Sequence, residues 1–123
     1  MYTIDYNAYR TLKPYGKRVR FLVLHYTAPA FSESIKSLTT GAASAHYLIP
    51  DPTDSSYIAA GHKGQKIFNL VAEEDRAWHA GVSQWAGRSG LNDTSIGIEI
   101  VNQATDVDGV FTFPDYEASQ ILA

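Results

Sequence analysis

The sequence predicts a single domain of the α/β (α+β) class, on the basis of its length, its strand-like segments and its helix-like segments. A chain of 123 residues is the size of one ordinary domain and can bury roughly two thirds of its unfolded surface. The strand-like segments cover residues 19–25, 45–49, 66–71 and 95–101. The helix-like segments begin at residues 32 and 114. No repeat and no Pro/Ser-rich linker divides the sequence, so residues 1–123 are expected to form one domain.

The first part of the chain is expected to contain a lead-in, a strand and a helix. Residues 1–16 are polar and aromatic with Pro and Gly breakers, which predicts an extended segment. From residue 19 the apolar run VRFLVLH predicts a buried strand that ends at His25. Ser32 is placed to cap a short helix, and Gly41 is expected to end it.

The middle of the chain alternates short strands with loops. The run AHYLI at residues 45–49 predicts a second strand, and the Pro- and Asp-rich stretch after it predicts an exposed loop over residues 50–64. Residues 66–71 predict a third strand. The Gly, Ser and Asn content of residues 80–93 predicts a long surface loop, which in a domain of this size is more often a binding element than a spacer.

The strongest strand pattern is the alternating run SIGIEIV at residues 95–101. Gly97 and Glu99 fall on the same face of that strand. The residues DVDG at 106–109 predict a turn, and Pro114 stands where a helix is expected to begin.

Composition and charge restrict the classes of function. The net charge of -3 and the pI near 5.7 provide no broad basic field for phosphate backbones, so nucleic acid is not an expected partner. No apolar run approaches the ~20 residues of a membrane-spanning helix, and residues 1–15 lack the pattern of an export signal. The chain has no Cys, so a metal site must be built from His, Asp and Glu. No G-x-S-x-G elbow, phosphate loop or H-E-x-x-H helix is present.

Two residues stand out as candidates for chemistry. His25 ends a core strand, so its ring can point from a rigid support into a cleft, as a first metal ligand requires. The alternative for His25 is a buried ring bonded to a backbone carbonyl. Glu99 lies in an apolar strand, where an ionised carboxylate is unfavourable unless it is paired, which favours a catalytic acid/base or a neighbour of a metal. Its alternative is a structural ion pair with Arg or Lys.

The remaining histidines are less specific. His79 follows Trp78 and precedes Ala and Gly, a pairing suited to a sugar or peptide groove, although loop packing by Trp78 explains the pattern as well. His46 stands either near a metal or in the core, and the core is favoured. His62, in a Gly- and Lys-rich loop, is expected to be solvated and to have no role.

Four blocks of sequence, in this order, strongly resemble the type 2 N-acetylmuramoyl-L-alanine amidases, zinc enzymes that cut the stem peptide from the sugar of bacterial peptidoglycan. The blocks are residues 23–28 (VLHYTA), 44–49 (SAHYLI), 76–81 (RAWHAG) and 91–99 (LNDTSIGIE). The resemblance spans nearly the whole chain and is closest to the AmiD-like amidases of the bacterial envelope.

The resemblance implies a central mixed β-sheet flanked by helices, with a Zn2+ ion held in a groove by two His and one Asp. His25 matches the first zinc ligand, and Glu99 matches the Glu that acts on the zinc-bound water. Trp78 and His79 match a wall of the substrate groove. His46 and Asn92 are the other two residues expected to contact substrate.

The resemblance also implies that part of the zinc site is missing. In the family the second His, the Asp and a Lys that stabilises the oxyanion come from a segment after the helix that begins here near Pro114. One His does not hold zinc at useful affinity, so the chain is expected to be an amidase domain truncated at its C-terminus. By the same resemblance, in the intact enzyme Glu99 would take a proton from the zinc-bound water and return it to the leaving L-alanine nitrogen.

Two other functions remain open, a peptidoglycan-binding module that has lost hydrolysis and an inactive fragment of the amidase. The presence of both His25 and Glu99 favours the enzyme, because a binding module has no need for a buried carboxylate. The expected partner is peptidoglycan or a muropeptide, and a membrane anchor in the parent protein is an open option. The expected compartment is the bacterial cell envelope or periplasm, with the cytoplasm as the alternative.

Overall fold

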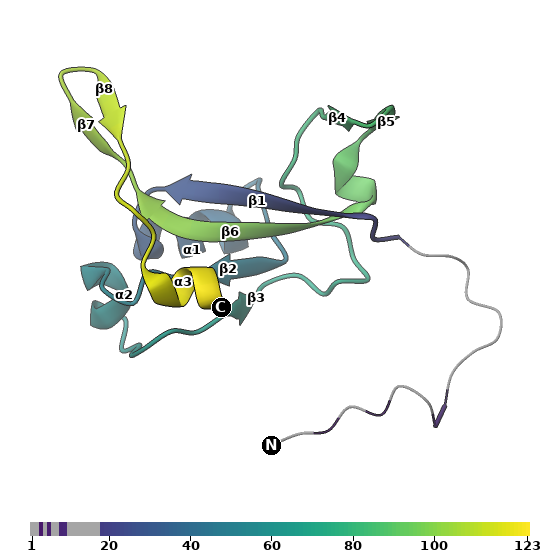
Figure 1. Cartoon of the computed structure of the whole chain (residues 1–123), viewed down its shortest axis with the longest axis horizontal. Coiled ribbons are helices and arrows are strands. Elements are labelled where there is room, and N and C mark those ends of the chain that lie inside the picture. The colour runs from purple at the N-terminus through teal and green to yellow at the C-terminus, as the bar shows by residue number, and fades with distance from the viewer. Residues whose placement is uncertain (1–2, 4, 6–7, 10–17) are drawn as a thin grey trace.

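The computed structural model describes residues 3, 5, 8, 9 and 18–123, so most of the lead-in expected at residues 1–16 lies outside the described residues. The described part forms a sheet with helices on both sides and two small hairpins (Figure 1). In chain order its elements are β1 (Phe21–Ala28), α1 (Phe31–Thr40), β2 (Tyr47–Ile49), α2 (Ser55–Ala59), β3 (Phe68–Asn69), β4 (Gln84–Trp85), β5 (Arg88–Ser89), the 3-10 helix η1 (Leu91–Asp93), β6 (Ser95–Gln103), β7 (Thr105–Val107), β8 (Val110–Thr112) and α3 (Ala118–Leu122).

The central sheet is mixed, as expected, with the strand order β1-β6-β2-β3. Strand β6 pairs in parallel with both β1 and β2, whereas β3 runs antiparallel to β2. The register places His25 opposite Glu99 on one side of β6 and Leu48 opposite Glu99 on the other. Because paired residues of neighbouring parallel strands point to the same face, these three side chains share one face of the sheet.

Strand β6 is long and apolar because it is the inner strand of the sheet. Ile96 is 7% exposed and Val101 is 1% exposed, as is typical of a parallel strand covered on both faces. Strand β1 lies at the edge and alternates instead: Leu22 and Leu24 are each 65% exposed, while His25 on the other face is half-buried. The alternation shows that one face of β1 is covered and the other is open.

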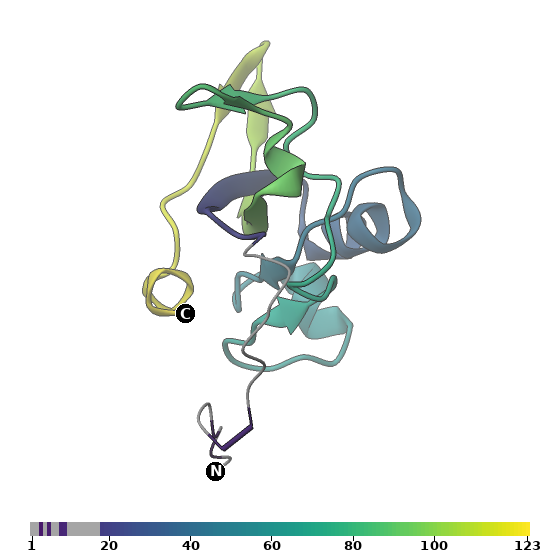
Figure 2. The ribbon, with the colours of Figure 1, turned by 90° about the vertical axis from the view of Figure 1, so that its right-hand side faces the viewer.

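Helix α1 covers the face of the sheet that carries His25 and Glu99 (Figure 2). Its buried residues Phe31 and Leu38 pack with Leu48 and Val101 in the core. Gly41 ends the helix as predicted, but Ser32 does not cap it. The Phe31 N–H instead donates to Asp54 Oδ2 over 2.7 Å, so the first turn of α1 is satisfied from a distant part of the chain.

The C-terminal helix α3 lies on the opposite side of the sheet from α1 (Figure 2). It begins at Ala118 rather than at Pro114, because the Glu117 and Gln120 side chains form a reciprocal capping box there. The buried Gln120 amide also donates to the Val101 carbonyl over 2.8 Å. That bond ties the helix to β6.

The segment between β2 and β3 differs most from expectation. Residues 50–64 were expected to be an exposed loop, but they contain α2, whose Tyr57 is 0% exposed. The prediction that His62 is solvated is wrong, since its half-buried ring stacks on Tyr57 with centroids 5.1 Å apart and meets Phe68 at 5.1 Å. The contacts between these aromatic rings hold Tyr57 and His62 against the domain, although most of the segment around them is exposed. Strand β3 covers Phe68–Asn69, so it is shorter than the strand predicted for residues 66–71.

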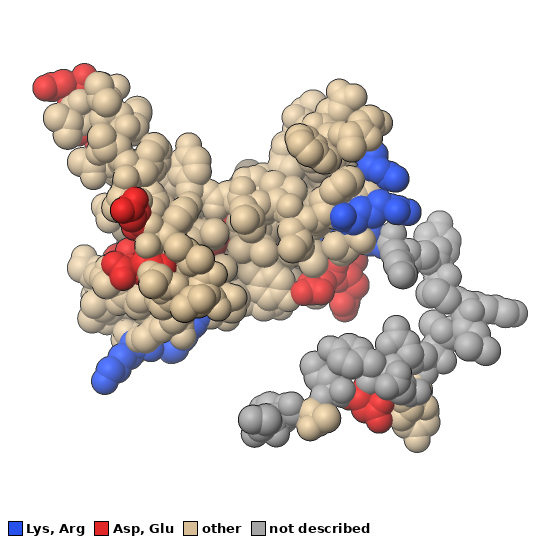
Figure 3. All heavy atoms as spheres, viewed as in Figure 1, with Lys and Arg blue, Asp and Glu red and all other residues tan. Residues whose placement is uncertain are grey.

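The exposed parts of the molecule carry few concentrated charges. The turn predicted at residues 106–109 is present, with Asp106 Oδ1 accepting from the Gly109 N–H, and it closes the β7–β8 hairpin that projects from the sheet (Figure 1). Figure 3 shows acidic and basic side chains in small separate groups on an otherwise uncharged face. None of the helices in the described part of the chain has the length and apolar character needed to cross a membrane.

Candidate functional site

The candidate site lies where β1 and β6 run side by side, on the face covered by α1. His25 and Glu99 are register partners there, and neighbouring strands lie about 4.8 Å apart. The sheet therefore brings together the two residues that the sequence marks as candidates for chemistry. Neither lies on a flexible loop, so both side chains start from a rigid support.

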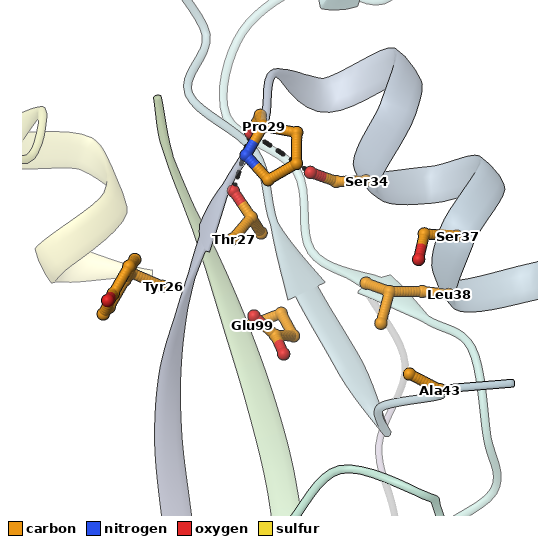
Figure 4. A pocket seen from close by; sticks show the side chains of 8 residues that line it. All are labelled: Tyr26, Thr27, Pro29, Ser34, Ser37, Leu38, Ala43 and Glu99. Carbon is orange, nitrogen blue, oxygen red and sulfur yellow. Dashed lines mark hydrogen bonds between the residues drawn. The ribbon is translucent and has the colours of Figure 1, made fainter. Parts of the chain in front are cut away.

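Glu99 points into a pocket of about 160 Å³ between the end of β1 and helix α1 (Figure 4). The pocket has hydroxyl groups and apolar carbon on its walls. Its lining residues are Tyr26, Thr27, Pro29, Ser34, Ser37, Leu38, Ala43 and Glu99. Glu99 Oε2 is buried and has no hydrogen-bond partner among the described residues, where no ion pair of Glu99 is found either. The ion-pair alternative is therefore not supported, and burial raises the pKa of the Glu99 carboxyl to about 7.

His25 is half-buried and is bonded to another histidine rather than to a backbone carbonyl. Its Nε2 lies 3.0 Å from His79 Nδ1, with the two rings nearly perpendicular at 75°. Burial lowers the pKa of His25, because a buried cation lacks the solvation of water. Nδ1, the other ring nitrogen, has no partner in the part of the chain that the structure describes.

His79 is held from several sides by the loop and by β6. Its Nε2 lies 2.9 Å from Ser95 Oγ, and its backbone N–H donates to Asn92 Oδ1 over 3.1 Å. Burial lowers the pKa of His79 to about 4, with further contributions from the nearby His25 and His46. His79 thus adopts a neutral state at pH 7 and lies behind His25, where it contacts protein groups on both ring nitrogens.

His46 occupies the core, which was the favoured interpretation of its sequence context. It is 0% exposed, and both ring nitrogens are bonded to backbone groups. The Gly97 N–H donates to Nδ1 over 3.0 Å, and Nε2 lies 2.9 Å from the Asp75 carbonyl. This placement differs from the expected substrate contact, because a fully buried ring is not reachable from a groove.

Trp78 and Asn92 line a second hollow of about 380 Å³ on the loop side of the site. Its other lining residues are Asp75, Arg76, Ala77 and Asp93. Trp78 is 73% exposed, so it is not the packing residue that the alternative interpretation required. An exposed indole beside an open hollow is the geometry expected of a groove wall.

Three residues of the site were not identified as functional from the sequence. Ser95 contacts the His79 ring, Gly97 lies beneath it, and Arg18 donates to the Ser95 carbonyl over 3.0 Å and to the Glu73 carbonyl. The alternation of Ser95, Gly97 and Glu99 on one face was a signal for the first two. Arg18 gives no signal in the sequence, since its partners are backbone carbonyls far along the chain.

The described residues do not complete a zinc site. A catalytic zinc usually has three protein ligands and water. No group of three or more His, Cys, Asp and Glu with metal-binding geometry is found among the residues that the structure describes. Among the three histidines of the site, His25 is the one with a ring nitrogen free for an ion, because His46 and His79 use both of theirs in bonds to described protein groups.

Comparison with known proteins gives consistent results. The sequence family described as N-acetylmuramoyl-L-alanine amidase matches residues 15–123. The chain is 43% identical over 108 residues to N-acetylmuramoyl-L-alanine amidase AmiD of Escherichia coli (strain K12), covering 86% of this chain and 37% of AmiD.

Two solved structures share the fold. AmpDh3 from Pseudomonas aeruginosa, in complex with anhydromuramic pentapeptide, has a TM-score of 0.83 and 80% identity, covering 99% of this chain and 48% of that one. AmiD from E. coli, in complex with the substrate anhydro-N-acetylmuramic acid-L-Ala-D-gamma-Glu-L-Lys, has a TM-score of 0.72 and 38% identity, covering 98% and 45%. The chain therefore spans less than half the length of AmiD and of AmpDh3.

Proposed function

Because the chain belongs to the N-acetylmuramoyl-L-alanine amidase family, we propose that it supplies the acid/base residue of an enzyme that hydrolyses the amide between N-acetylmuramic acid and L-alanine. The substrate is peptidoglycan or its fragments. The observation that carries this proposal is Glu99, a buried carboxyl without an ion partner among the described residues, at the wall of an open pocket. Such a group has no structural purpose and is unfavourable for folding, so its presence points to chemistry.

The pKa of Glu99 suits a residue that must both accept and donate a proton. At a pKa of about 7 the carboxylate and the carboxylic acid are both populated near neutral pH. In the first step the carboxylate accepts a proton from the water that attacks the amide carbonyl. In the second step the acid returns that proton to the L-alanine nitrogen as the C–N bond breaks. Without the returned proton the leaving group would be an amine anion.

The hollow lined by Trp78 and Asn92 is the proposed wall of the substrate groove. Supporting this, the indole is exposed and offers an apolar face to a sugar ring or a peptide. Asn92 Oδ1 already accepts from the His79 and Ala80 N–H groups, which leaves its amide nitrogen for substrate. His79, with both ring nitrogens engaged, is the less suitable contact.

Zinc is proposed as the cofactor of the complete site, with His25 as one ligand. The free Nδ1 of His25 supports this assignment, and the other ligands have to come from outside the described residues. The cell envelope or periplasm remains the predicted compartment.

The experiment is cleavage of an anhydromuramyl tripeptide by a version of the protein that carries the remaining zinc ligands, with the released peptide measured by mass spectrometry. Glu99→Gln keeps the shape of the side chain and removes its proton transfer, so the rate is expected to fall by about 10²- to 10⁴-fold. Glu33→Gln, at an exposed acidic residue of α1, is the matched control and is expected to leave the rate unchanged. Binding of the peptide without cleavage, in a version of the protein that carries the remaining zinc ligands and is supplied with zinc, would contradict the enzyme and favour the binding module.

A further inference from the structure

The hydrogen bonds around His25 form a continuous chain of four residues. Ser95 Oγ donates to the Leu91 carbonyl over 2.5 Å and lies 2.9 Å from His79 Nε2. His79 Nδ1 in turn lies 3.0 Å from His25 Nε2. The chain thus links η1, β6, the loop before β4 and β1.

The Leu91 carbonyl fixes the direction of every bond in this chain, because a carbonyl oxygen can only accept. The Ser95 hydroxyl has one proton and gives it to Leu91, so Ser95 Oγ must accept from His79 Nε2–H. A neutral imidazole has one N–H, and His79 Nδ1 is therefore an acceptor. Only His25 Nε2 can supply the proton for that last bond.

At about pH 8, where an ordinary histidine is neutral, His79 carries one ring proton. A proton on both nitrogens of His79 would also place two N–H groups against each other at His25 or force His25 to reverse its tautomer. The neutral ring satisfies all three bonds at once.

We propose that Ser95 and His79 are positioning residues that hold His25 in the tautomer with its proton on Nε2 and a free electron pair on Nδ1. The Leu91 carbonyl sets the tautomer, and the intervening hydroxyl and imidazole transmit it to β1. In the opposite tautomer, His25 would present an N–H where an electron pair is needed to bind a cation or accept a proton. The use of the electron pair rests on the proposed function, whereas the tautomer does not.

The local packing fixes the ring of His79 as well as its protons. Asn92 Oδ1 accepts from the backbone N–H groups of His79 and Ala80. Gly97 lies so close beneath the imidazole that a Cβ there would be 2.4 Å from His79 Cγ. The ring therefore has one available position, which keeps Nδ1 aimed at His25.

The test is ¹⁵N NMR of the histidine rings in the labelled 123-residue chain at about pH 8, where an ordinary histidine is neutral. The ¹⁵N shifts distinguish protonated from unprotonated ring nitrogens. In the native chain His25 is expected as the Nε2–H form by about tenfold over the other, the preference that one net hydrogen bond provides. His25 with its proton on Nδ1, or an even mixture, overturns the proposal without any variant.

Three variants test whether Ser95 and His79 transmit the tautomer to His25. Ser95→Ala removes the acceptor of His79 Nε2–H, so the Nδ1–H form of His25 is expected to rise about fivefold or more. An unchanged His25 in this variant overturns the role of Ser95. His79→Asn places an amide oxygen near the former Nδ1 and is expected to keep the native tautomer of His25, whereas His79→Leu is expected to lose it.

His46 and Ser44 provide the controls. His46 is held as the Nε2–H form by the Gly97 N–H and the Asp75 carbonyl, so an unchanged His46 signal shows that a variant is folded. Ser44→Ala loosens the same loop, because Ser44 Oγ accepts from the Trp78 N–H, but it does not touch the chain of four residues. In a version of the protein that carries the remaining zinc ligands, a native tautomer without cleavage of muropeptide would count against the proposed function alone. A cleaving protein with the reversed tautomer would count against the positioning role alone.

Discussion

The imidazole of His79 lies directly on the backbone of Gly97. A Cβ added at Gly97 would stand 2.4 Å from His79 Cγ and 2.6 Å from Cδ2, closer than real carbon atoms approach. Gly97 is in an ordinary strand conformation, so the absence of a side chain is required by the ring and not by the backbone.

The first prediction follows from this contact. Gly97→Ala is expected to reduce the free energy of unfolding by about 2 kcal/mol, because the added methyl overpacks a rigid site. Urea denaturation of Gly97→Ala, His79→Ala and the double variant measures the coupling energy between residues 97 and 79. With His79→Ala in the background, the further loss caused by Gly97→Ala is expected to be much smaller. Equal losses in both backgrounds would show that the ring is not the obstacle.

The second prediction concerns the pH dependence of stability at Glu99. Its folded-state pKa of about 7 lies above the ordinary 4.5, so the carboxyl penalises folding once it ionises. Stability from this group is retained below about pH 4.5 and is lost as the pH rises through 7. Glu99→Gln is therefore expected to be more stable than the native chain by about 1–3 kcal/mol at pH 8 and equal to it at pH 4. Thermal denaturation across this range checks it, with Glu33→Gln expected to show no such trend.

The third prediction uses two exposed tryptophans as a matched pair. Trp78, beside the hollow, is 73% exposed, and Trp85, on the β4–β5 hairpin, is 65% exposed. Trp78→Ala is expected to weaken muropeptide binding by about tenfold, because the contact of an aromatic side chain with a ligand contributes about 1 kcal/mol or more. Trp85→Ala is expected to leave binding unchanged, and both are expected to change stability by less than about 0.5 kcal/mol. Isothermal titration calorimetry on an uncleaved substrate analogue measures the affinity of each variant. Equal losses of affinity would show that the hollow beside Trp78 is not part of the substrate groove.

The fourth prediction concerns Asp54, which caps two helices at once. Its side chain accepts from the Phe31 N–H at the start of α1 and from the Ser56 N–H in α2. Burial alone would raise the pKa of Asp54, but these hydrogen bonds outweigh it and lower the pKa below its ordinary 3.8. Asp54→Ala is expected to lose about 2–3 kcal/mol, the sum of two caps.

The pH trend of Asp54 has the opposite sign to that of Glu99. A lowered folded-state pKa gives stability that is present above the ordinary pKa and lost as the pH falls through the folded value. The loss caused by Asp54→Ala is therefore expected to shrink below about pH 4. Asp115→Ala, at an exposed carboxylate near α3, is the control, and an equal effect of the two variants would contradict the capping role.

The sheet was predictable because its inner strands carry long apolar runs. Strand β6 and the alternation that places Gly97 with Glu99 follow from side-chain period alone. The cap of α1 was not predictable, since the Phe31 N–H donates to Asp54, which lies in another segment of the chain. From the local sequence Ser32 is the better candidate for a capping residue. Local patterns identify elements, but a cap supplied from a distance changes where they begin.

The site was predicted only in part, because local patterns mark single residues and do not show which of them meet in the fold. His25 and Glu99 were marked individually, and their adjacency depends on a parallel register that neither segment encodes by itself. Ser95 was not identified, because its place on the same face as Glu99 does not by itself show which residue its hydroxyl contacts. Its place in the chain of hydrogen bonds exists only after β6 meets the loop that carries His79.

The parallel pairing of β1 with β6 also has a consequence for folding. Glu99 follows His25 by 74 positions, so bringing them together closes a long loop before any sheet contact compensates for the lost entropy. Parallel pairing at such separation is intrinsically slow. During synthesis the ribosome has delivered α1, α2 and all four histidines before β6 emerges. The pocket that Glu99 enters is thus a late product of folding, and in a nascent or partly folded chain His25 and Glu99 stay apart until the central strand is in place.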